Sequence, residues 1–187
     1  MTDQDTGGVL AGFIRAADRI MDGICVLFLI LANASLALML IGTAATIVLR
    51  PFNLGFYWIW PWTMQFFVWL AFFGFYVIYR RQKDIAVDFL MQRLGAGAMN
   101  FTRYFVILVT LVVCGLMLME AGVILETQVG EIEGVILPGG VELERYTLSI
   151  PLFLSTLLIF INTLLDLLKA LTGVPEVIPS HVQDPEG

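Results

Sequence analysis

The sequence predicts an all-α integral membrane protein with four transmembrane helices. Hydrophobic residues make up 59% of its 187 residues and charged residues only 14%, whereas a soluble domain is about half apolar and about a quarter charged. The apolar residues gather in four long runs, and the acidic residues behind the net charge of -6 lie almost wholly outside these runs. No basic stripe suits nucleic acid, so we expect contact with membrane lipid and none with nucleic acid.

The four runs are expected to be membrane-spanning helices. A spanning helix needs roughly 20 mostly apolar residues, and the hydrocarbon holds no water to satisfy free backbone groups, so each run should be helical. The expected crossings are about 23–48, 58–79, 104–125 and 148–168. They form a membrane domain of residues 23–172, preceded by a cytoplasmic segment of residues 1–22 and followed by a loose cytoplasmic tail of residues 173–187.

The distribution of basic residues predicts that both termini are cytoplasmic, because basic residues favour the cytoplasmic side of a membrane. In this orientation the two outer loops contain few basic residues, which are Arg50 and Arg145. The loop between the second and third crossings is then inside, and its basic residues are Arg80, Arg81, Lys83, Arg93 and Arg103.

A short amphipathic helix is expected at the inner membrane face, between the second and third crossings. The segment KDIAVDFLMQRL (residues 83–94) places Ile85, Phe89 and Leu90 at helical spacing, with polar residues between them. Such a helix lies in the plane of the interface with its apolar face against the lipid.

The outer loop between the third and fourth crossings carries four glutamates, Glu131, Glu133, Glu142 and Glu144. They flank a Pro138-Gly139-Gly140 turn signal, which favours a small hairpin-like excursion. A disordered loop is the alternative.

The first two crossings differ in the size of their side chains. Along the first, small residues recur at three- and four-residue steps, and this stripe of Ala32, Ser35, Gly42 and Thr46 suits close helix packing. The same crossing carries Asn33, one of the few polar groups near mid-membrane. The second crossing is bulky nearly all round because of its aromatic residues, which are Phe66, Phe67, Trp69, Phe72, Phe73, Phe75, Tyr76 and Tyr79. Such a helix can face lipid, or it can present a wide apolar surface to another membrane protein.

The chain lacks the residues that membrane enzymes and haem or zinc proteins need. Its single histidine, His181, lies in the expected tail, and Cys25 and Cys114 lie inside apolar runs as small hydrophobes. The acids Glu120 and Asp166 fall near the membrane boundaries and not at the midplane. We therefore expect no enzyme, and no catalytic, cofactor-binding or metal-binding residue is predicted.

A series of short motifs around the second crossing occurs in a recognisable order. The motifs are Arg50-Pro51-Phe52, Pro61-Trp62, Trp69 with Gly74, Arg80-Arg81 and Ile85-Ala86-Val87-Asp88. In this order, and in its topology over about residues 15–172, the chain resembles the small membrane subunit (DctQ-like) of tripartite ATP-independent periplasmic (TRAP) transporters. It departs from the family pattern at Met64-Gln65, where acids are common, and at Asp84, where a histidine is common.

The resemblance implies a non-catalytic scaffold subunit of a sodium-driven secondary transporter for the uptake of organic acids, located in the bacterial inner membrane. The implied partners are a large, many-helix permease subunit and a periplasmic substrate-binding protein. The residues expected at the interface with the permease are Arg50, Trp58, Trp60, Trp62, Trp69, Gly74, Arg80, Arg81 and Asp88. The residues expected to help dock the binding protein are Glu131, Glu133, Glu142 and Glu144.

Two other functions are open at this point. A small subunit of a tricarboxylate-type tripartite transporter would share the topology but not the order of motifs from Arg50 to Asp88. A homo-oligomeric membrane protein or channel would need pore-facing polar residues, which these helices lack.

Overall fold

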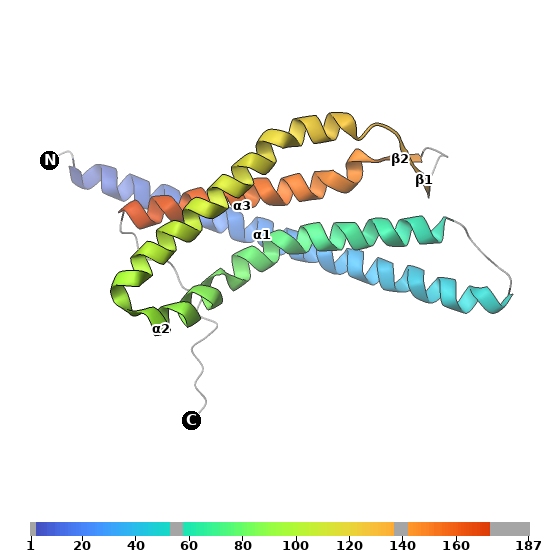
Figure 1. The fold of residues 1–187 in the computed structure, drawn as a ribbon, viewed down its shortest axis with the longest axis horizontal. Helices are drawn as coiled ribbons and strands as arrows, with labels where there is room; N and C mark the ends of the chain where they lie inside the picture. The colour runs from blue at the N-terminus through green and yellow to red at the C-terminus, as the bar shows by residue number, and fades with distance from the viewer. Residues whose placement is uncertain (1–2, 53–57, 137–141, 173–187) are drawn as a thin grey trace, which may run out of the picture.

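The described part of the chain is almost entirely helical, with one small β-hairpin (Figure 1). The computed structural model describes residues 3–52, 58–136 and 142–172, and the side chains of residues 12–52, 58–81, 104–136 and 142–172. In chain order, the elements are α1 (Asp3–Leu49), the 3₁₀ turn η1 (Arg50–Phe52), α2 (Ile59–Thr127), β1 (Glu131–Ile136), β2 (Glu142–Glu144) and α3 (Tyr146–Thr172).

Four described segments are long and apolar enough to cross a membrane, as the sequence predicted. They are Gly12–Phe52, Ile59–Arg81, Tyr104–Thr127 and Tyr146–Thr172. The second and third belong to one helix, because α2 stays helical between them while it turns back on itself (Figure 1). The sequence predicted a separate short helix in this connection, and the backbone of residues 82–103 instead continues α2. The side chains there lie outside the described residues, so an amphipathic face at the inner membrane surface stays a prediction.

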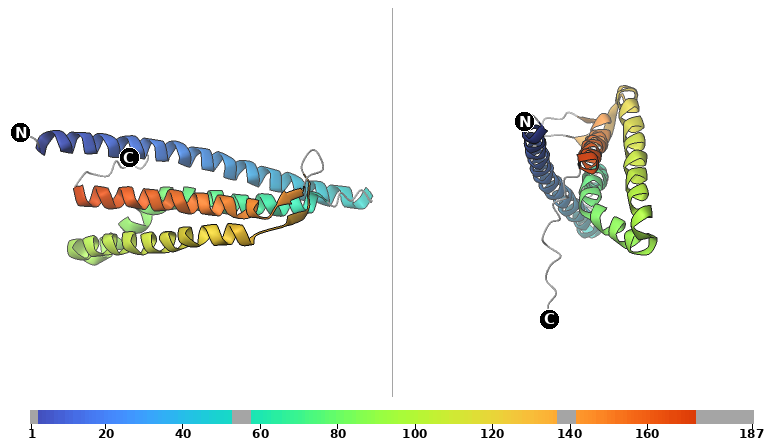
Figure 2. Two further views of the ribbon diagram at one scale, coloured as in Figure 1. Left: turned by 90° about the horizontal axis from the view of Figure 1, so that it is seen from above. Right: turned by 90° about the vertical axis from the view of Figure 1, so that its left-hand side faces the viewer.

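Helix α1 is much longer than a membrane is thick. At about 1.5 Å per residue its 47 residues extend about 70 Å, more than twice the hydrocarbon thickness of about 30 Å. It runs along the whole length of the molecule in Figure 2. Part of α1 must therefore extend beyond the hydrocarbon, unless the helix lies steeply tilted.

The first crossing of α2 packs between α1 and α3, and the hydrophobic core lies where the three helices meet. The core residues are Met21, Cys25, Phe28, Tyr76, Val77, Cys114, Leu158, Ile159 and Leu165. The Phe28 ring stands edge-on to the rings of Phe73 and Tyr76, with centroids 5.3 and 5.5 Å away, a favourable geometry for aromatic pairs. Helix α3 is the most buried of the four crossings and the third crossing is the least buried, so α3 lies at the centre of the molecule.

The small residues of α1 form a packing seam over most of the stripe that the sequence predicted. Ala32 and Ser35 are buried. At Gly42, an added Cβ would lie 2.7 Å from Thr63 Oγ1, so α1 and α2 approach closely there. Thr46 is exposed, and the seam therefore ends before it.

The loop between the third and fourth crossings forms a hairpin, in agreement with the first of the two expectations for it. Strands β1 and β2 pair antiparallel, with Glu131 opposite Glu144 and Ile136 opposite Glu142. The turn at Pro138-Gly139-Gly140 lies outside the described residues.

The hairpin packs against the start of α2 through Gly134 and Pro61. Gly134 has a φ of 83°, which favours glycine. An added Cβ at this position would lie 2.9 Å from Pro61 Cγ. The glycine therefore serves both the strand conformation and the close approach.

Candidate functional site

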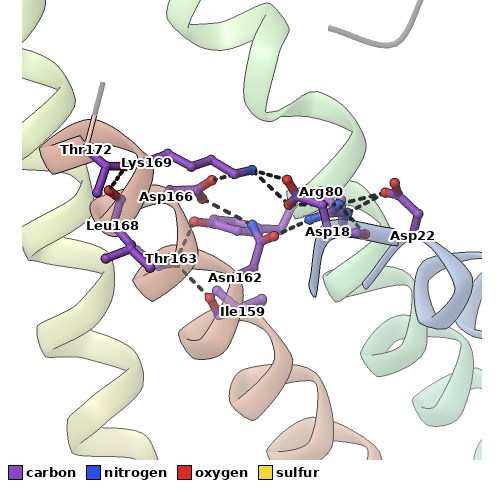
Figure 3. Close-up of polar contacts among 11 residues, drawn as sticks. Asp18, Asp22, Arg80, Ile159, Asn162, Thr163, Asp166, Leu168, Lys169 and Thr172 are labelled. Carbon is purple, nitrogen blue, oxygen red and sulfur yellow. Dashed lines mark hydrogen bonds and ion pairs between the residues drawn. The ribbon is translucent and has the colours of Figure 1, made fainter. Parts of the chain in front are cut away.

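A group of polar side chains joins α1, α2 and α3 near the end of the second crossing (Figure 3). We call it the polar cluster, and it consists of Asp18, Asp22, Arg80, Asn162, Asp166 and Lys169. Residues three or four apart share one face of a helix. Asp18 and Asp22 therefore lie on one face of α1, and the three cluster residues of α3 lie on one face of that helix.

Arg80 is the centre of the polar cluster. Its Nε and Nη2 donate hydrogen bonds to Asp22 Oδ1 over 2.9 and 2.7 Å, and Nη2 also donates to the backbone oxygen of Asp18 over 3.3 Å. Its Nη1 donates to Asn162 Oδ1. The planar guanidinium carries donors pointing in several fixed directions, so this one side chain of α2 binds α1 and α3 at once.

Lys169 supplies the second cation of the cluster. Its Nζ lies 2.6 Å from Asp18 Oδ2 and 4.0 Å from Asp166 Oδ1. Asn162 Nδ2 donates to Asp166 Oδ2 over 3.3 Å. Asp166 and Lys169 are both buried, and a buried charge is costly unless it is paired. The cluster therefore stabilises one arrangement of the three helices.

Two tyrosines of α2 extend these polar contacts into the core. The hydroxyl of Tyr76 donates to the backbone oxygen of Met21 on α1 over 3.2 Å. The hydroxyl of Tyr79 lies 2.8 Å from Thr163 Oγ1 on α3. The ring bodies fill the apolar space and the hydroxyls find partners, as buried tyrosines usually do.

A second set of contacts lies toward the hairpin end of α2, where Trp62 and Trp69 are about 27 and about 16 Å along the helix from Arg80 at about 1.5 Å per residue. Trp62 Nε1 donates to the backbone oxygen of Ile136 over 3.3 Å, which ties the hairpin to α2. Trp69 Nε1 donates to the backbone oxygen of Thr147 over 3.1 Å, which ties α2 to the start of α3. Trp62 therefore fixes the second crossing at its other end, and Trp69 fixes it near its middle.

Gln65 lies between these two tryptophans in the sequence, and its side chain is buried. Its Nε2 lies 3.5 Å from Thr147 Oγ1, while its Oε1 has no hydrogen-bond partner among the described residues. Gln65 is one of the two residues, Met64 and Gln65, that stand where the resemblance leads one to expect acidic residues.

The residues expected at the permease interface do not form one site. Trp62, Trp69 and Arg80 bind other parts of this chain. The exposed members are Arg50, Trp58, Trp60 and Arg81. Gly74 is half-buried and has nothing within 4 Å of an added Cβ, and the side chain of Asp88 lies outside the described residues.

The residues expected to dock a binding protein are brought together on the hairpin. Glu131, Glu133 and Glu144 are exposed, and Glu142 is half-buried. Glu131 and Glu144 face each other across the strands. The hairpin therefore presents a compact acidic surface.

Asp18, Asp22 and Lys169 were not predicted from the sequence as partners in a cluster, and Asp166 was predicted only as a carboxylate near a membrane boundary. A signal was present, because Asp18 and Asp22 are four residues apart on a helix whose other face is apolar. Among the described residues, no group of three or more histidine, cysteine, aspartate or glutamate side chains is arranged to hold a metal ion. The carboxylates of the polar cluster are bound to Arg80 and Lys169, so the cluster can hold α1, α2 and α3 in position.

The four apolar segments and the contacts between them define a multi-pass membrane protein. A family model described as "Tripartite ATP-independent periplasmic transporters, DctQ component" matches residues 39–173. The chain belongs to this family, and is thus a small membrane component of a TRAP transporter, whose other parts are a large permease and a binding protein. No curated protein and no solved structure matches the chain.

Proposed function

We propose that the chain is the non-catalytic scaffold subunit of a sodium-driven secondary transporter that takes up organic acids. On this proposal it packs against the large permease subunit, which carries the substrate and the sodium ions. It crosses the bacterial inner membrane with both termini in the cytoplasm, so that the polar cluster lies near the inner face and the hairpin lies outside. The scaffold role is supported chiefly by one observation: the second crossing is bound to its neighbours at both ends.

A scaffold needs helices that keep their relative positions while another part of the transporter moves. At one end of the second crossing, Arg80 binds α1 and α3 together. At the other end Trp62 binds the hairpin, and nearer the middle Trp69 binds the start of α3. The Arg80 side chain is 15% exposed and that of Asp22 is 69% exposed, and a hydrogen bond to a charged group contributes about 1.5–3 kcal/mol, so shifting these helices past one another would be unfavourable. This supports a rigid subunit and not a moving element.

The exposed members of the expected interface are proposed to contact the permease directly. Trp58 and Trp60 are exposed beside the start of α2, and Arg50 is exposed in η1. Aromatic residues and arginine are the side chains most enriched in protein interfaces. Trp62 and Trp69 then act indirectly, because they hold the helix that carries the exposed tryptophans.

The hairpin is proposed to help dock the binding protein from the periplasm. Its exposed glutamates form an anionic surface at the end of the molecule opposite the polar cluster. Such a surface accelerates encounter with a partner that carries basic residues on the matching face. Docking at this point would place the binding protein beside the permease.

Reconstitution tests the proposal. The chain and the large permease encoded with it are co-expressed, purified in mild detergent and placed in liposomes, with the binding protein added outside. We expect near-equal recovery of the two membrane subunits, and uptake of labelled dicarboxylates or sialic acid that requires both subunits, the binding protein and an inward sodium gradient. A potassium gradient of equal size is the control. Full uptake by the permease without this chain would contradict the scaffold role.

A further inference from the structure

Asn33 is a polar side chain on an outward face of α1, within the membrane-crossing segment Gly12–Phe52. It is exposed, whereas the neighbouring Ala32 and Ser35 are buried. Among the residues whose side chains are described, it makes no hydrogen bond with any other. A carboxamide offers two N–H donors and one carbonyl acceptor, so among the described residues all of the hydrogen-bonding capacity of Asn33 is unused.

The exposed hydroxyls of the same helix differ from Asn33 in this respect. Thr43 Oγ1 donates to the backbone oxygen of Met39 over 2.8 Å, and Thr46 Oγ1 donates to that of Gly42 over 2.9 Å. These threonines are satisfied by their own helix and can face lipid. Asn33 has no such contact among the described residues, and its amide needs a partner beyond them.

The depth of Asn33 excludes water and lipid headgroups as that partner. At about 1.5 Å per residue, Asn33 lies about 16 Å along α1 from Asp22 of the polar cluster and about 25 Å from Arg50. With about 30 Å of hydrocarbon to cross, this position is near the middle of the membrane. Lipid tails offer no hydrogen bond, and an unpaired amide in hydrocarbon is unfavourable.

The surroundings of Asn33 leave room for another helix. Ala34 and Ala37 are exposed beside it, and Ala37 is one turn further along the same side of α1. Small side chains let two helices approach closely enough for a hydrogen bond across their interface. The Asn33 amide is the group that indicates a partner helix. The two alanines determine only how closely that helix can approach.

We propose that the Asn33 face, made of Asn33, Ala34 and Ala37, binds a transmembrane helix of the large permease that offers a hydrogen-bonding group to the Asn33 amide. This inference rests on the proposed function, which supplies the permease as the partner. It adds the place of contact: the side of α1 away from α2, and not only the tryptophans at the start of α2. The occupant must be a protein helix, because lipid cannot satisfy the amide.

The first test replaces the amide. Asn33→Leu should lower the amount of co-purified permease about 3- to 30-fold, the range expected for one hydrogen bond between membrane helices. Asn33→Gln should retain more of it, and Thr46→Val is the matched control at an exposed, internally satisfied site. The Asn33→Leu chain purified alone should melt no lower than the wild type, because leucine suits lipid. Unchanged recovery of permease with Asn33→Leu would overturn the inference.

The second test locates the partner by photo-crosslinking in the co-expressed complex. Benzoylphenylalanine is placed at position 37, and at position 116 as a control on the exposed, apolar third crossing. We expect an adduct with the permease from position 37 and none from position 116. An adduct from position 37 only with a second copy of this chain would overturn the inference. Permease adducts from position 116 alone would also overturn the inference, but the proposed function would then stand. If the wild-type chain recovers no permease at all, the proposed function itself fails and this inference fails with it.

Discussion

Lys169 and Asp18 form an ion pair that connects the end of α3 to α1, with Nζ 2.6 Å from Oδ2. The two residues are 151 positions apart in the chain. Their side chains are only 10% and 18% exposed, so water screens the pair weakly. The pair therefore couples the positions of two helices that otherwise have few contacts with each other.

Replacing Lys169 with methionine should destabilise the protein strongly. Asp18 would lose its nearest cation and keep only Arg80, whose Nη2 lies 3.7 Å from Asp18 Oδ1, so the expected loss in the free energy of unfolding is about 1–3 kcal/mol. Unfolding by heat in detergent, followed by circular dichroism, measures the loss. Arg81→Met is the control, because Arg81 is exposed. The double change Lys169→Met with Asp18→Asn should recover part of the stability, and an equal loss in the control would contradict the prediction.

Arg80→Lys should also destabilise the protein, although it keeps the charge. Lysine has no planar fork of donors and cannot bind Asp22 and Asn162 at once in the way that Arg80 does. We expect a loss of about 1–3 kcal/mol from the broken charge-assisted hydrogen bonds. Arg81→Lys provides the matched comparison. Wild-type stability of Arg80→Lys would mean that charge alone holds the helices.

The four crossings could be predicted from the sequence because length and apolar composition are local properties of each run. The polar cluster could not, because it depends on which helices pack together. In the sequence Arg80 is one of several basic residues between the second and third crossings, and nothing local connects it to Asp22 on another helix. The carboxylates of α1 can be read from the sequence, but their partners are determined by how the helices pack.

The tryptophans show a second limit of the sequence. On a helix that is bulky nearly all round, aromatic residues do not reveal which side faces inward. Trp62 and Trp69 point to backbone oxygens of Ile136 and Thr147 because the hairpin and the start of α3 fold back over α2. Trp60, in the same stretch, is 64% exposed. The interface expected from the motif therefore divides into residues that support the fold and residues whose side chains are exposed.

Gly42→Ala should weaken the contact between α1 and α2. The added Cβ would lie 2.7 Å from Thr63 Oγ1, and that hydroxyl is held by a hydrogen bond of 2.9 Å to the backbone oxygen of Ile59. Rotating or displacing Thr63 should cost about 1–2 kcal/mol of unfolding free energy. Gly74→Ala is the control, since nothing lies within 4 Å of its Cβ. In a double-mutant cycle with Thr63→Ala the two effects should be less than additive, and strict additivity would refute the close contact.

Gly134→Ala should loosen the hairpin from α2. Alanine at a φ of 83° is strained by about 1–2 kcal/mol, and its Cβ would lie 2.9 Å from Pro61 Cγ. We expect a lower melting temperature and faster hydrogen exchange in residues 131–136. Gly122→Ala has open space at its Cβ and is the comparison. Unchanged exchange in β1 would show that the hairpin does not depend on this contact.

Neutralising the hairpin should slow docking of the binding protein without harming the membrane subunit. The variant changes Glu131, Glu133, Glu142 and Glu144 to glutamine. Exposed charges contribute little to stability, so the melting temperature and the recovery of permease should stay close to wild type. Removing the anionic surface should lower the rate of uptake at limiting concentrations of binding protein, and the effect should shrink as salt rises, because salt screens the attraction. Glu120→Gln, on the third crossing, is the control. Wild-type uptake by the fourfold variant at low salt would remove the hairpin glutamates from the docking site and leave the scaffold role intact.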